Sequence, residues 1–385
     1  MTTYDFIIIG AGIAGASLAY RLSADVAAEK AGGASVLLLE MEDQPGRHST
    51  GRSAAFYAET YGNETIRRIT AASRAFYEDP PKGFTDAPLL EPCGALHIGT
   101  DAQGAALDEH FEATRSLAPT IERRDGVFAK DKVPVLDETR ITGCVWEPDS
   151  KAINVHELHQ GFLSAAKRSG VSLVTRAEVR DITRSSEVWS ITAGTQTYEG
   201  SVLINAAGAW AGDIGRAAGA MPLDLTPFRR SVCVIDPKKA QGVEGDVSGW
   251  PLVIDIDENF YFKPSGGTIW LSPADETPSP PCDAQPEELD IARAVHHMEE
   301  ATSIRVRRIE HQWAGLRTFS SDRTPAVGFD PTCDGFFWLA GQGGYGIQTA
   351  PALSEIAAHL LGAGDLPKDL VAPQEVLDAL NPGRF

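Results

Sequence analysis

A glycine motif between two apolar runs is the feature of this chain that most restricts its fold. Gly10, Gly12 and Gly15 follow an isoleucine-rich run at residues 4–9, and a helix-forming run at residues 14–22 comes next. The hydrophobic period changes at Gly10, which predicts a strand, a turn and a helix. Such glycines make the tight turn, let backbone approach a pyrophosphate and let the helix pack on the strand. Because the helix N-terminus also attracts anions, the motif predicts dinucleotide binding.

An acidic residue completes this motif. Residues 35–40 form a second apolar run that ends at Glu40, and its pattern is that of a buried strand. A carboxylate at the end of such a βαβ unit can accept both hydroxyls of an adenosine ribose. We assign the long spacing between Gly15 and Glu40 to a surface insertion over residues 25–34. The alternative, glycines that only turn the chain beside a surface glutamate, leaves the coincidence of strand, helix and acid unexplained.

Composition places the chain among folded globular proteins. Of its 385 residues, 43% are apolar and 23% are charged, which excludes a mostly disordered chain. The net charge of −19 disfavours nucleic acid as a partner. The apolar run at residues 6–20 has Asp5 where a signal peptide is positive, and it is too short and glycine-rich to span a bilayer. We therefore expect a cytoplasmic protein, and leave peripheral contact with a membrane open.

Neither the cysteines nor the histidines form a metal motif. The five cysteines lie far apart in sequence, so there is no CxxC pair and we expect free thiols. His156 and His159 resemble part of an HExxH motif, but a zinc site of that kind needs its histidines four residues apart. We predict no metal site and expect these two histidines on a helix surface.

The rest of the chain is predicted to continue with helices and buried strands. Asn63 and Asn154 stand where helices begin, and Pro80 and Pro81 end the first of these helices. Residues 81–149 alternate short apolar runs with turns. Predicted helices cover residues 64–78, 154–167, 286–301 and 347–361, and predicted strands cover residues 171–174, 202–205, 261–264, 268–271 and 336–340.

A second glycine-rich turn favours FAD over NAD. Gly341, Gly343 and Gly346 formally match GxGxxG, but only one helix follows them, with no strand or acidic end after it. This turn therefore suits a helix N-terminus placed near the anionic side of a reduced flavin. With one complete motif and no evident nicotinamide site, we predict FAD that is reduced by the substrate itself.

Four segments of the chain together carry a family resemblance; they are residues 10–15, 46–55, 205–210 and 341–346. They resemble the flavoprotein family of D-amino acid oxidases, glycine and sarcosine oxidases and D-amino acid dehydrogenases. Within the family the likeness is strongest to bacterial D-arginine dehydrogenases, and it extends over essentially the whole chain. The segments that carry this closer likeness are residues 48–55, 70–76, 313–317 and 343–349.

The resemblance implies an α/β fold with two domains that are discontinuous in sequence. A Rossmann-type FAD-binding domain would take residues 1–80, 150–217 and 320–385, and an antiparallel-sheet substrate domain, covering the flavin, would take residues 81–149 and 218–319. It also implies non-covalent FAD, although some relatives attach the flavin through a histidine near His48. The implied FAD-binding residues are Gly10, Gly12, Ile13, Ala14, Gly15, Glu40, His48, Ser49, Thr50, Arg52, Ser53, Ala54, Val179, Ala207, Gly208, Trp210, Gly341, Gly343, Gly344, Tyr345, Gly346, Ile347 and Gln348.

The resemblance also implies a set of substrate-binding side chains. Arg317 and Arg230 match the family's carboxylate-binding arginines, and an arginine fork can hold a carboxylate through two charge-assisted bonds. Tyr61, Tyr261 and Tyr345 match aromatic positions around the substrate. The alternative readings are surface arginines on a sheet and tyrosines that only pack in the core.

Two departures from D-arginine dehydrogenases change the expected substrate. Phe56 stands where those enzymes have a histidine, and Ala95 where they have the glutamate that meets the guanidinium. An apolar wall offers no partner to a buried cation. We therefore expect a neutral or apolar substrate side chain.

The resulting hypothesis is FAD-dependent oxidation of a D-amino acid to the imino acid, which hydrolyses to the 2-oxo acid. The family moves a hydride from Cα to flavin N5, so no strong side-chain base is required. The electron acceptor, whether oxygen, a quinone or an electron carrier, stays open. One alternative is oxidation of a secondary amine such as sarcosine, proline or another N-alkyl amino acid; another is a flavin-carrying module without amine chemistry.

Overall fold

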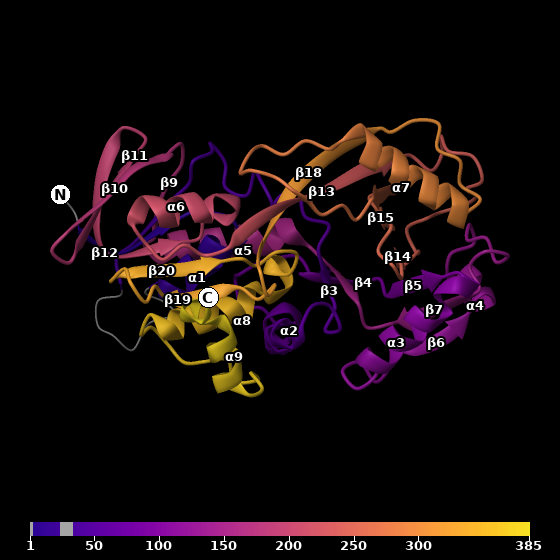
Figure 1. Ribbon diagram of the computed structural model, residues 1–385, viewed down its shortest axis with the longest axis horizontal. Coiled ribbons are helices and arrows are strands. Elements are labelled where there is room, and N and C mark those ends of the chain that lie inside the picture. The colour runs from indigo at the N-terminus through magenta and orange to yellow at the C-terminus, as the bar shows by residue number, and fades with distance from the viewer. Residues whose placement is uncertain (1–2, 24–33) are drawn as a thin grey trace.

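Two large sheets form the framework of the protein. The computed structural model describes residues 3–23 and 34–385, and the predicted insertion at residues 25–34 lies almost wholly outside the described residues. The first sheet lies on the left of Figure 1, and most of the second lies on the right. Within the described part of the chain, no helix is long and apolar enough to cross a bilayer.

The first sheet is mixed, with a parallel centre that contains the predicted βαβ unit. Its strand order is β10-β11-β12-β1-β2-β9, with β20 beside β12 and β19 beside β20. Strand β1 pairs in parallel with both β2 and β12. The strands are β1 (Thr3–Ile9), β2 (Val36–Leu39), β9 (Ser172–Val174), β10 (Val179–Ser185), β11 (Val188–Ala193), β12 (Gln196–Asn205), β19 (Ala326–Phe329) and β20 (Phe336–Ala340).

Helices cover this sheet and explain its apolar strands. All four residues of β2 are buried, as expected for a parallel strand with both faces covered. One core packs beneath α1, α5 and α8, and a second packs on the opposite face near α6. The helices associated with this sheet are α1 (Ile13–Leu22), α2 (Glu64–Glu78), α5 (Val155–Arg168), α6 (Ala211–Ala218), α8 (Gly346–Leu360) and α9 (Pro373–Leu380), with short 3₁₀ turns η2 (Gly208–Trp210) and η3 (Pro382–Arg384).

The second sheet is antiparallel except where β14 meets β5. Its order is β17-β13-β16-β15-β14-β5-β7-β6, with β18 beside β13. The strands are β5 (Ala95–Gly99), β6 (Glu122–Asp125), β7 (Gly143–Glu147), β13 (Leu225–Ile235), β14 (Leu252–Asp255), β15 (Tyr261–Ser265), β16 (Thr268–Ser272), β17 (Thr277–Pro278) and β18 (His311–Ser320).

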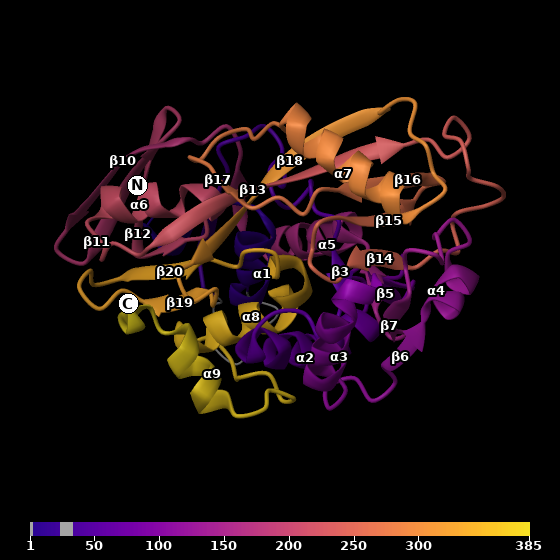
Figure 2. The same cartoon turned by 45° about the vertical axis from the view of Figure 1, so that its right-hand side comes forward.

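One face of the second sheet carries its own core. Phe262, Ile269, Leu271 and Cys233 point into this core, so their strand neighbours face the other way. Helix α7 packs against β13 and β16, and both views place it beside this sheet (Figures 1 and 2). The helices associated with this sheet are η1 (Asp101–Gln103), α3 (Gly104–Thr114), α4 (Gly126–Lys132) and α7 (Glu288–Ala301).

A small third sheet joins the two large ones. It has the order β3-β8-β4 and is built from β3 (Phe56–Tyr57), β4 (Leu90–Pro92) and β8 (Lys151–Ile153). The α/β class with a parallel and an antiparallel sheet agrees with the prediction. The domain boundaries at residues 80, 150, 217 and 320 stay a prediction.

Candidate functional site

A cavity of about 420 Å³ lies where the two large sheets face each other. Its wall includes the glycine turn after β1, the loop at residues 46–55, the segment after β12 and the glycine turn before α8. The second sheet contributes Arg230 and Val232 from β13, Tyr261 from β15 and Arg317 from β18. The volume is within the range of small-molecule sites.

The first glycine turn is too crowded for side chains. Gly10 has a φ of +101°, and a Cβ added to it would overlap the carbonyl oxygen of Ala206. A Cβ on Gly15 would overlap the carbonyl of Gly10, where α1 packs against the turn. These contacts are the physical reasons for glycine in a turn that brings a helix N-terminus to a pyrophosphate.

Glu40 lies at the end of β2, with only 8% of its surface exposed. One carboxylate oxygen accepts the N–H of Ala11 and the other accepts the N–H of Glu42, each at 3.0 Å. Burial raises the pKa of Glu40, and the two backbone bonds partly oppose that shift. Because a carboxylate oxygen has two lone pairs, each oxygen can still accept a hydrogen bond from a ribose hydroxyl.

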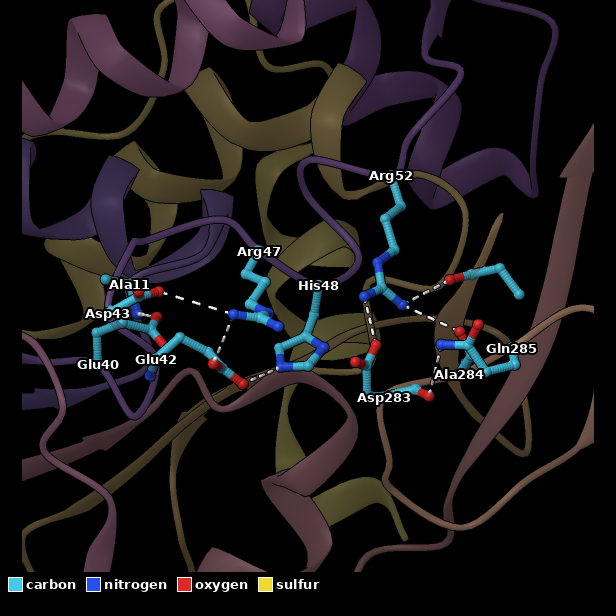
Figure 3. Close-up of polar contacts among 11 residues, drawn as sticks. Ala11, Glu40, Glu42, Asp43, Arg47, His48, Arg52, Asp283, Ala284 and Gln285 are labelled. Carbon is cyan, nitrogen blue, oxygen red and sulfur yellow. Dashed lines mark hydrogen bonds and ion pairs between the residues drawn. The ribbon is translucent and has the colours of Figure 1, made fainter. Parts of the chain in front are cut away.

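The loop at residues 46–55 is fastened to both sheets. Thr50 Oγ1 accepts the N–H of Ile13 at 2.9 Å, and Ser49 Oγ donates to the carbonyl of Leu316 at 2.6 Å. Arg52 donates to the carbonyls of Ala284 and Ala314 and forms an ion pair with Asp283 (Figure 3). The loop therefore holds the start of α1 and strand β18 in one fixed relation.

His48 lies on this loop and is already bonded. Its Nε2 lies 2.8 Å from a carboxylate oxygen of Glu42 (Figure 3), and its ring centroid is 4.9 Å from that of Trp210. Both His48 and Trp210 line the cavity. The hydrogen bond occupies one ring nitrogen, and the tryptophan packs against the ring.

The late glycine turn brings α8 to the same cavity. Gly341 and Gly343 have positive φ angles, and a Cβ on Gly343 would overlap the ring of Phe319. The N-cap residues of α1 and α8, Gly12 and Tyr345, make no side-chain capping bond. Thr50 accepts the N–H of Ile13 in the first turn of α1, but neither helix is capped by its own N-cap side chain. Two helix N-termini therefore meet at one cavity, and free N–H groups of a first turn attract anionic ligand atoms.

Arg317 is a guanidinium that faces the cavity without an acidic partner. No Asp or Glu in residues 3–23 and 34–385 forms an ion pair with it. A Cβ on Gly344 would lie 3.1 Å from both Arg317 Nη1 and the hydroxyl of Tyr61, so both groups lie beside that backbone. Burial favours a lower pKa, but Tyr61, Tyr261 and more distant carboxylates outweigh it, and the pKa of Arg317 is raised.

Arg230, by contrast, already has a carboxylate partner. Its Nη2 donates to Glu276 at 3.1 Å, and Glu276 also pairs with Arg323. Burial favours a higher pKa for Glu276, but Arg323, Arg230 and Arg317 together lower it. Sequence reasoning missed Glu276, which lies at the start of β17 and meets Arg230 only through the pairing of β17 with β13.

A family model with the description FAD dependent oxidoreductase (DAO) matches residues 5–360 of this chain. The chain belongs to this family. FAD-dependent oxidoreductase domain-containing protein 1 of Mus musculus is 23% identical to this chain. The alignment is 403 positions long, gaps included, and covers 94% of this chain and 81% of the mouse protein.

Solved structures agree with the family. Glycine oxidase from Geobacillus kaustophilus matches with a TM-score of 0.79 at 20% identity, over 97% of this chain and 98% of that chain. L-Proline dehydrogenase from P. horikoshii matches with a TM-score of 0.79 at 21% identity, over 100% and 98% of the two chains. These two likenesses show the fold.

The cavity of this oxidoreductase fits its family's cofactor. Gly12 lines the cavity where a Cβ would lie 3.2 Å from Thr50 Oγ1, Glu40 keeps acceptor capacity for a ribose, and α1 and α8 begin at the cavity without a bond from their own N-cap side chains. When bound, FAD supplies an acceptor for two electrons and a proton in the form of hydride.

Most predicted residues line the cavity. The structure brings together Gly10, Gly12, Ile13, Ala14, Glu40, His48, Ser49, Thr50, Arg52, Ser53, Ala54, Val179, Ala207, Gly208, Trp210, Arg230, Tyr261, Arg317, Gly343, Gly344, Gly346 and Ile347. The sequence analysis did not name several other lining residues, among them Met41, Arg47, Glu178, Arg180, Asp213, Val232, Gly315, Thr318 and Gln342. Several of these adjoin a predicted residue in sequence, so their nearness to a recognised motif is the signal that could have identified them.

Seven predicted residues lie outside the cavity wall; they are Gly15, Phe56, Tyr61, Ala95, Gly341, Tyr345 and Gln348. The rings of Tyr61 and Tyr345 are in contact, with centroids 4.9 Å apart. Gln348 donates to the hydroxyl of Thr70 in the core. Gly15 and Gly341 act through the backbone turns described above.

Phe56 and Ala95 lie in different surroundings from each other. Phe56 begins β3, and its ring centroid lies 4.7 Å from the ammonium of Lys263. Ala95 begins β5 and is 3% exposed, opposite Glu147 of β7. Sequence reasoning named neither Lys263 nor Glu147.

The two histidines of α5 differ in burial, which corrects the expectation of a surface pair. His156 is exposed, but His159 is buried, and its Nε2 lies 2.9 Å from the carbonyl oxygen of Ala11. Burial lowers the pKa of His159, so it bonds this carbonyl as a neutral donor. This hydrogen bond ties α5 to the glycine turn after β1 and so helps to fix the position of that turn.

Proposed function

We propose that this oxidoreductase oxidises an α-amino acid at its Cα–N bond, with the substrate carboxylate bound by Arg317. The observation that carries the proposal is a half-buried guanidinium that faces the FAD cavity and forms no ion pair with the described residues. A carboxylate supplies the missing charge through two parallel hydrogen bonds. Arg230 is already paired with Glu276. We therefore assign it a secondary role, in which its positive charge contributes to the electrostatic potential around the substrate.

The side chains around Arg317 would orient the substrate rather than move protons. Tyr61 and Arg317 both lie beside the backbone of Gly344, and Tyr261 lines the cavity with Arg317. A carboxylate fixed at two points leaves Cα one bond away, so the reacting C–H adopts a restricted orientation. Bound FAD would supply the acceptor for the hydride lost from Cα of the neutral amine. The resulting imino acid would be hydrolysed by water to the 2-oxo acid and ammonia.

The finer substrate proposal is a D-amino acid whose side chain is not cationic. The D configuration comes from the family resemblance of residues 48–55 and 343–349. The side-chain preference comes from Phe56, which stands where the resemblance places a histidine. Neutral side chains should therefore react better than those of D-arginine or D-lysine.

A secondary amine is the second candidate. Among the solved structures with this fold are a glycine oxidase and an L-proline dehydrogenase, and Arg317 could hold the carboxylate of an N-alkyl amino acid equally well. The two candidates differ only in the substituent on nitrogen, which the Arg317 contact does not select.

An anaerobic bleaching screen tests the proposal. The FAD-loaded protein is mixed with D-, L- and N-methyl amino acids in the absence of oxygen, and loss of flavin absorbance near 450 nm is followed. Bleaching by D-amino acids supports the first candidate, and bleaching only by N-methyl amino acids or proline supports the second. A flavin that stays yellow with every amino acid would reject amine oxidation and favour a flavin-carrying module. Admitting oxygen or a quinone analogue to the bleached protein then identifies the acceptor class.

A further inference from the structure

Lys263 lies on the face of the second sheet that looks toward the FAD cavity. In β15, Phe262 points into the opposite core and is fully buried, so Tyr261 and Lys263 share the other face. Tyr261 lines the cavity. The strand register agrees with this placement. Lys263 lies opposite Trp270 of β16, so the two side chains share one face, and the indole of Trp270 contacts that of Trp313.

The ammonium of Lys263 is held by aromatic rings and not by an acid. Its Nζ lies 4.7 Å from the ring centroid of Phe56 and 5.2 Å from that of Trp270. No carboxylate in residues 3–23 and 34–385 forms an ion pair with it. Burial lowers the pKa of Lys263, while Cys93 and Glu91 act in the opposite direction. The Cys93 thiol stays neutral near pH 7, because burial raises its pKa to about 11.

A second cavity of about 310 Å³ surrounds this lysine. Its wall is mostly polar and comes from the hairpin of β15 and β16 and from the small third sheet. The lining residues are Glu91, Ala152, Ile153, Asn154, Ser248, Lys263, Pro264, Ser265, Gly266 and Gly267. Glu91 is exposed and does not pair with the lysine. Lys263 is therefore the charged group of this cavity that lacks an acidic partner.

Strand β15 contributes to the walls of both cavities. Tyr261 lines the first and Lys263 lines the second, and positions two apart on one strand face are about 7 Å apart. This spacing is comparable to the length of an extended dicarboxylate of four or five carbons. Phe56, the residue expected beside the substrate side chain, lies against the ammonium of Lys263.

We propose that Lys263 forms a second anion subsite, and that the preferred substrates are amino acids with an additional carboxylate, such as D-glutamate. The inference rests on the proposed function, because it places the first carboxylate on Arg317. It refines the expected preference: anionic side chains rank first, neutral ones second and cationic ones last.

The electrostatic surroundings of Lys263 support this ranking of substrate side chains. A partly buried ammonium interacts with aromatic faces, but a carboxylate adds a charge-assisted hydrogen bond that neither ring can provide. A cationic side chain in the same place meets a like charge in a region of low dielectric, which disfavours binding. A neutral side chain neither gains the bond nor meets the repulsion.

The sharpest comparison uses two substrates of nearly equal shape. D-Glutamate and D-glutamine differ in one charged group, so the ratio of their rates of anaerobic flavin reduction at low concentration isolates the effect of charge. We expect D-glutamate to react roughly tenfold or more faster, the value of a charge-assisted bond. D-Lysine should be slower than D-glutamine. Equal rates for the acid and the amide would overturn the subsite.

Three variants locate the effect. Lys263→Met should remove the preference for D-glutamate over D-glutamine. Lys167→Met, at an exposed position in the last turn of α5, is the control for the change in net charge. Glu91→Gln should increase the preference, because it removes a competing negative charge from the same cavity. An unchanged ratio in both Lys263→Met and Glu91→Gln would reject the proposal.

A binding measurement without turnover separates this inference from the proposed function. Glutarate has two carboxylates and no amine, and pentanoate has one carboxylate on a similar chain. Each is titrated into the FAD-loaded wild type while the flavin spectrum is followed. Tighter binding of glutarate, lost in Lys263→Met, supports the subsite even if no amino acid bleaches the flavin. If amino acids bleach the flavin but glutarate binds no better than pentanoate, the subsite is wrong and the amine oxidation stands.

Discussion

The hydroxyl oxygen of Thr50 accepts the backbone N–H of Ile13 across 2.9 Å, and so ties the loop at residues 46–55 to the first turn of α1. The same loop reaches the second sheet through Ser49 and Arg52. Thr50 is itself buried. Binding of FAD between the sheets therefore depends on a loop whose position is set by hydrogen bonds to both of them.

Thr50→Val keeps the shape of the side chain but removes this acceptor. The N–H of Ile13 then loses its partner beside the cofactor, so we expect FAD to bind roughly tenfold more weakly. Titration of the apoprotein with FAD, followed by flavin fluorescence, gives the dissociation constant. Thr50→Ser retains the hydroxyl and should stay close to wild type; equal affinities for the valine and serine variants would contradict the role of the bond.

Glu40 should make FAD affinity depend on pH. Burial raises its pKa. The carboxylate therefore takes up a proton at a higher pH than an ordinary glutamate, whose pKa is about 4.3. The protonated form is a weaker acceptor for ribose hydroxyls, and we expect FAD affinity to fall as the pH drops through this raised pKa. Glu40→Gln should bind FAD more weakly at neutral pH and lose that pH dependence. Glu187→Gln, in the exposed turn between β10 and β11, is the matched control.

FAD is expected to be bound without a covalent link. His48 already uses Nε2 in a hydrogen bond with Glu42 and packs against Trp210. Precipitation with trichloroacetic acid should therefore release the yellow colour into the supernatant. Colour that stays with the pellet would show attachment, and His48→Ala would then identify whether this histidine carries the flavin.

Arg317→Leu tests the carboxylate site. A leucine cannot replace two charge-assisted bonds in a half-buried site, so we expect kcat/KM to fall by about a hundredfold or more. The FAD content should not change. Arg317→Lys keeps the charge without the planar fork and should recover only part of the loss. Near-normal kinetics in the leucine variant, or equal activity on amines without a carboxylate, would reject the site.

The cofactor half of the site could be predicted from sequence because its signals are local. The glycine spacing, the acidic end of β2 and the turn before α8 each lie within one short segment. The helix predicted at residues 64–78 is α2 (Glu64–Glu78), whose N-cap Asn63 accepts the N–H of Ile66. Caps and proline stops act on neighbouring residues, so they are readable without tertiary contacts.

The substrate half was harder to predict because it depends on strand register. Glu276 meets Arg230 across 46 positions of sequence, and Lys263 meets Phe56 across two different sheets. Hydrophobic alternation gives the face of each residue but not which strand lies beside it. Helix α4 was missed for a related reason: it begins at Gly126, whose missing side chain makes room for the carbonyl of Ile141.

Ala95 provides the last test, because its predicted and observed surroundings differ. The resemblance places it at the substrate side chain, whereas in the fold it is 3% exposed and opposite Glu147 in the register of β5 and β7. Both oxygens of Glu147 accept the hydroxyl of Thr60, at 3.0 and 2.8 Å. Burial raises the pKa of Glu147. A second carboxylate here would be a buried charge without a partner.

We therefore expect Ala95→Glu to destabilise the protein by roughly 2 kcal/mol or more rather than to create activity on D-arginine. Two buried carboxyls bind protons more tightly in the folded chain than in the unfolded one. Their contribution to the free energy of unfolding is therefore retained at low pH and lost as the pH rises above about 4.3 toward their raised pKa values. Thermal unfolding at pH 5 and pH 8 should show a larger loss of Tm at the higher pH. Ala95→Val adds volume without charge and should lack this pH dependence. A glutamate variant with wild-type Tm that gains activity on D-arginine would instead place residue 95 at the substrate.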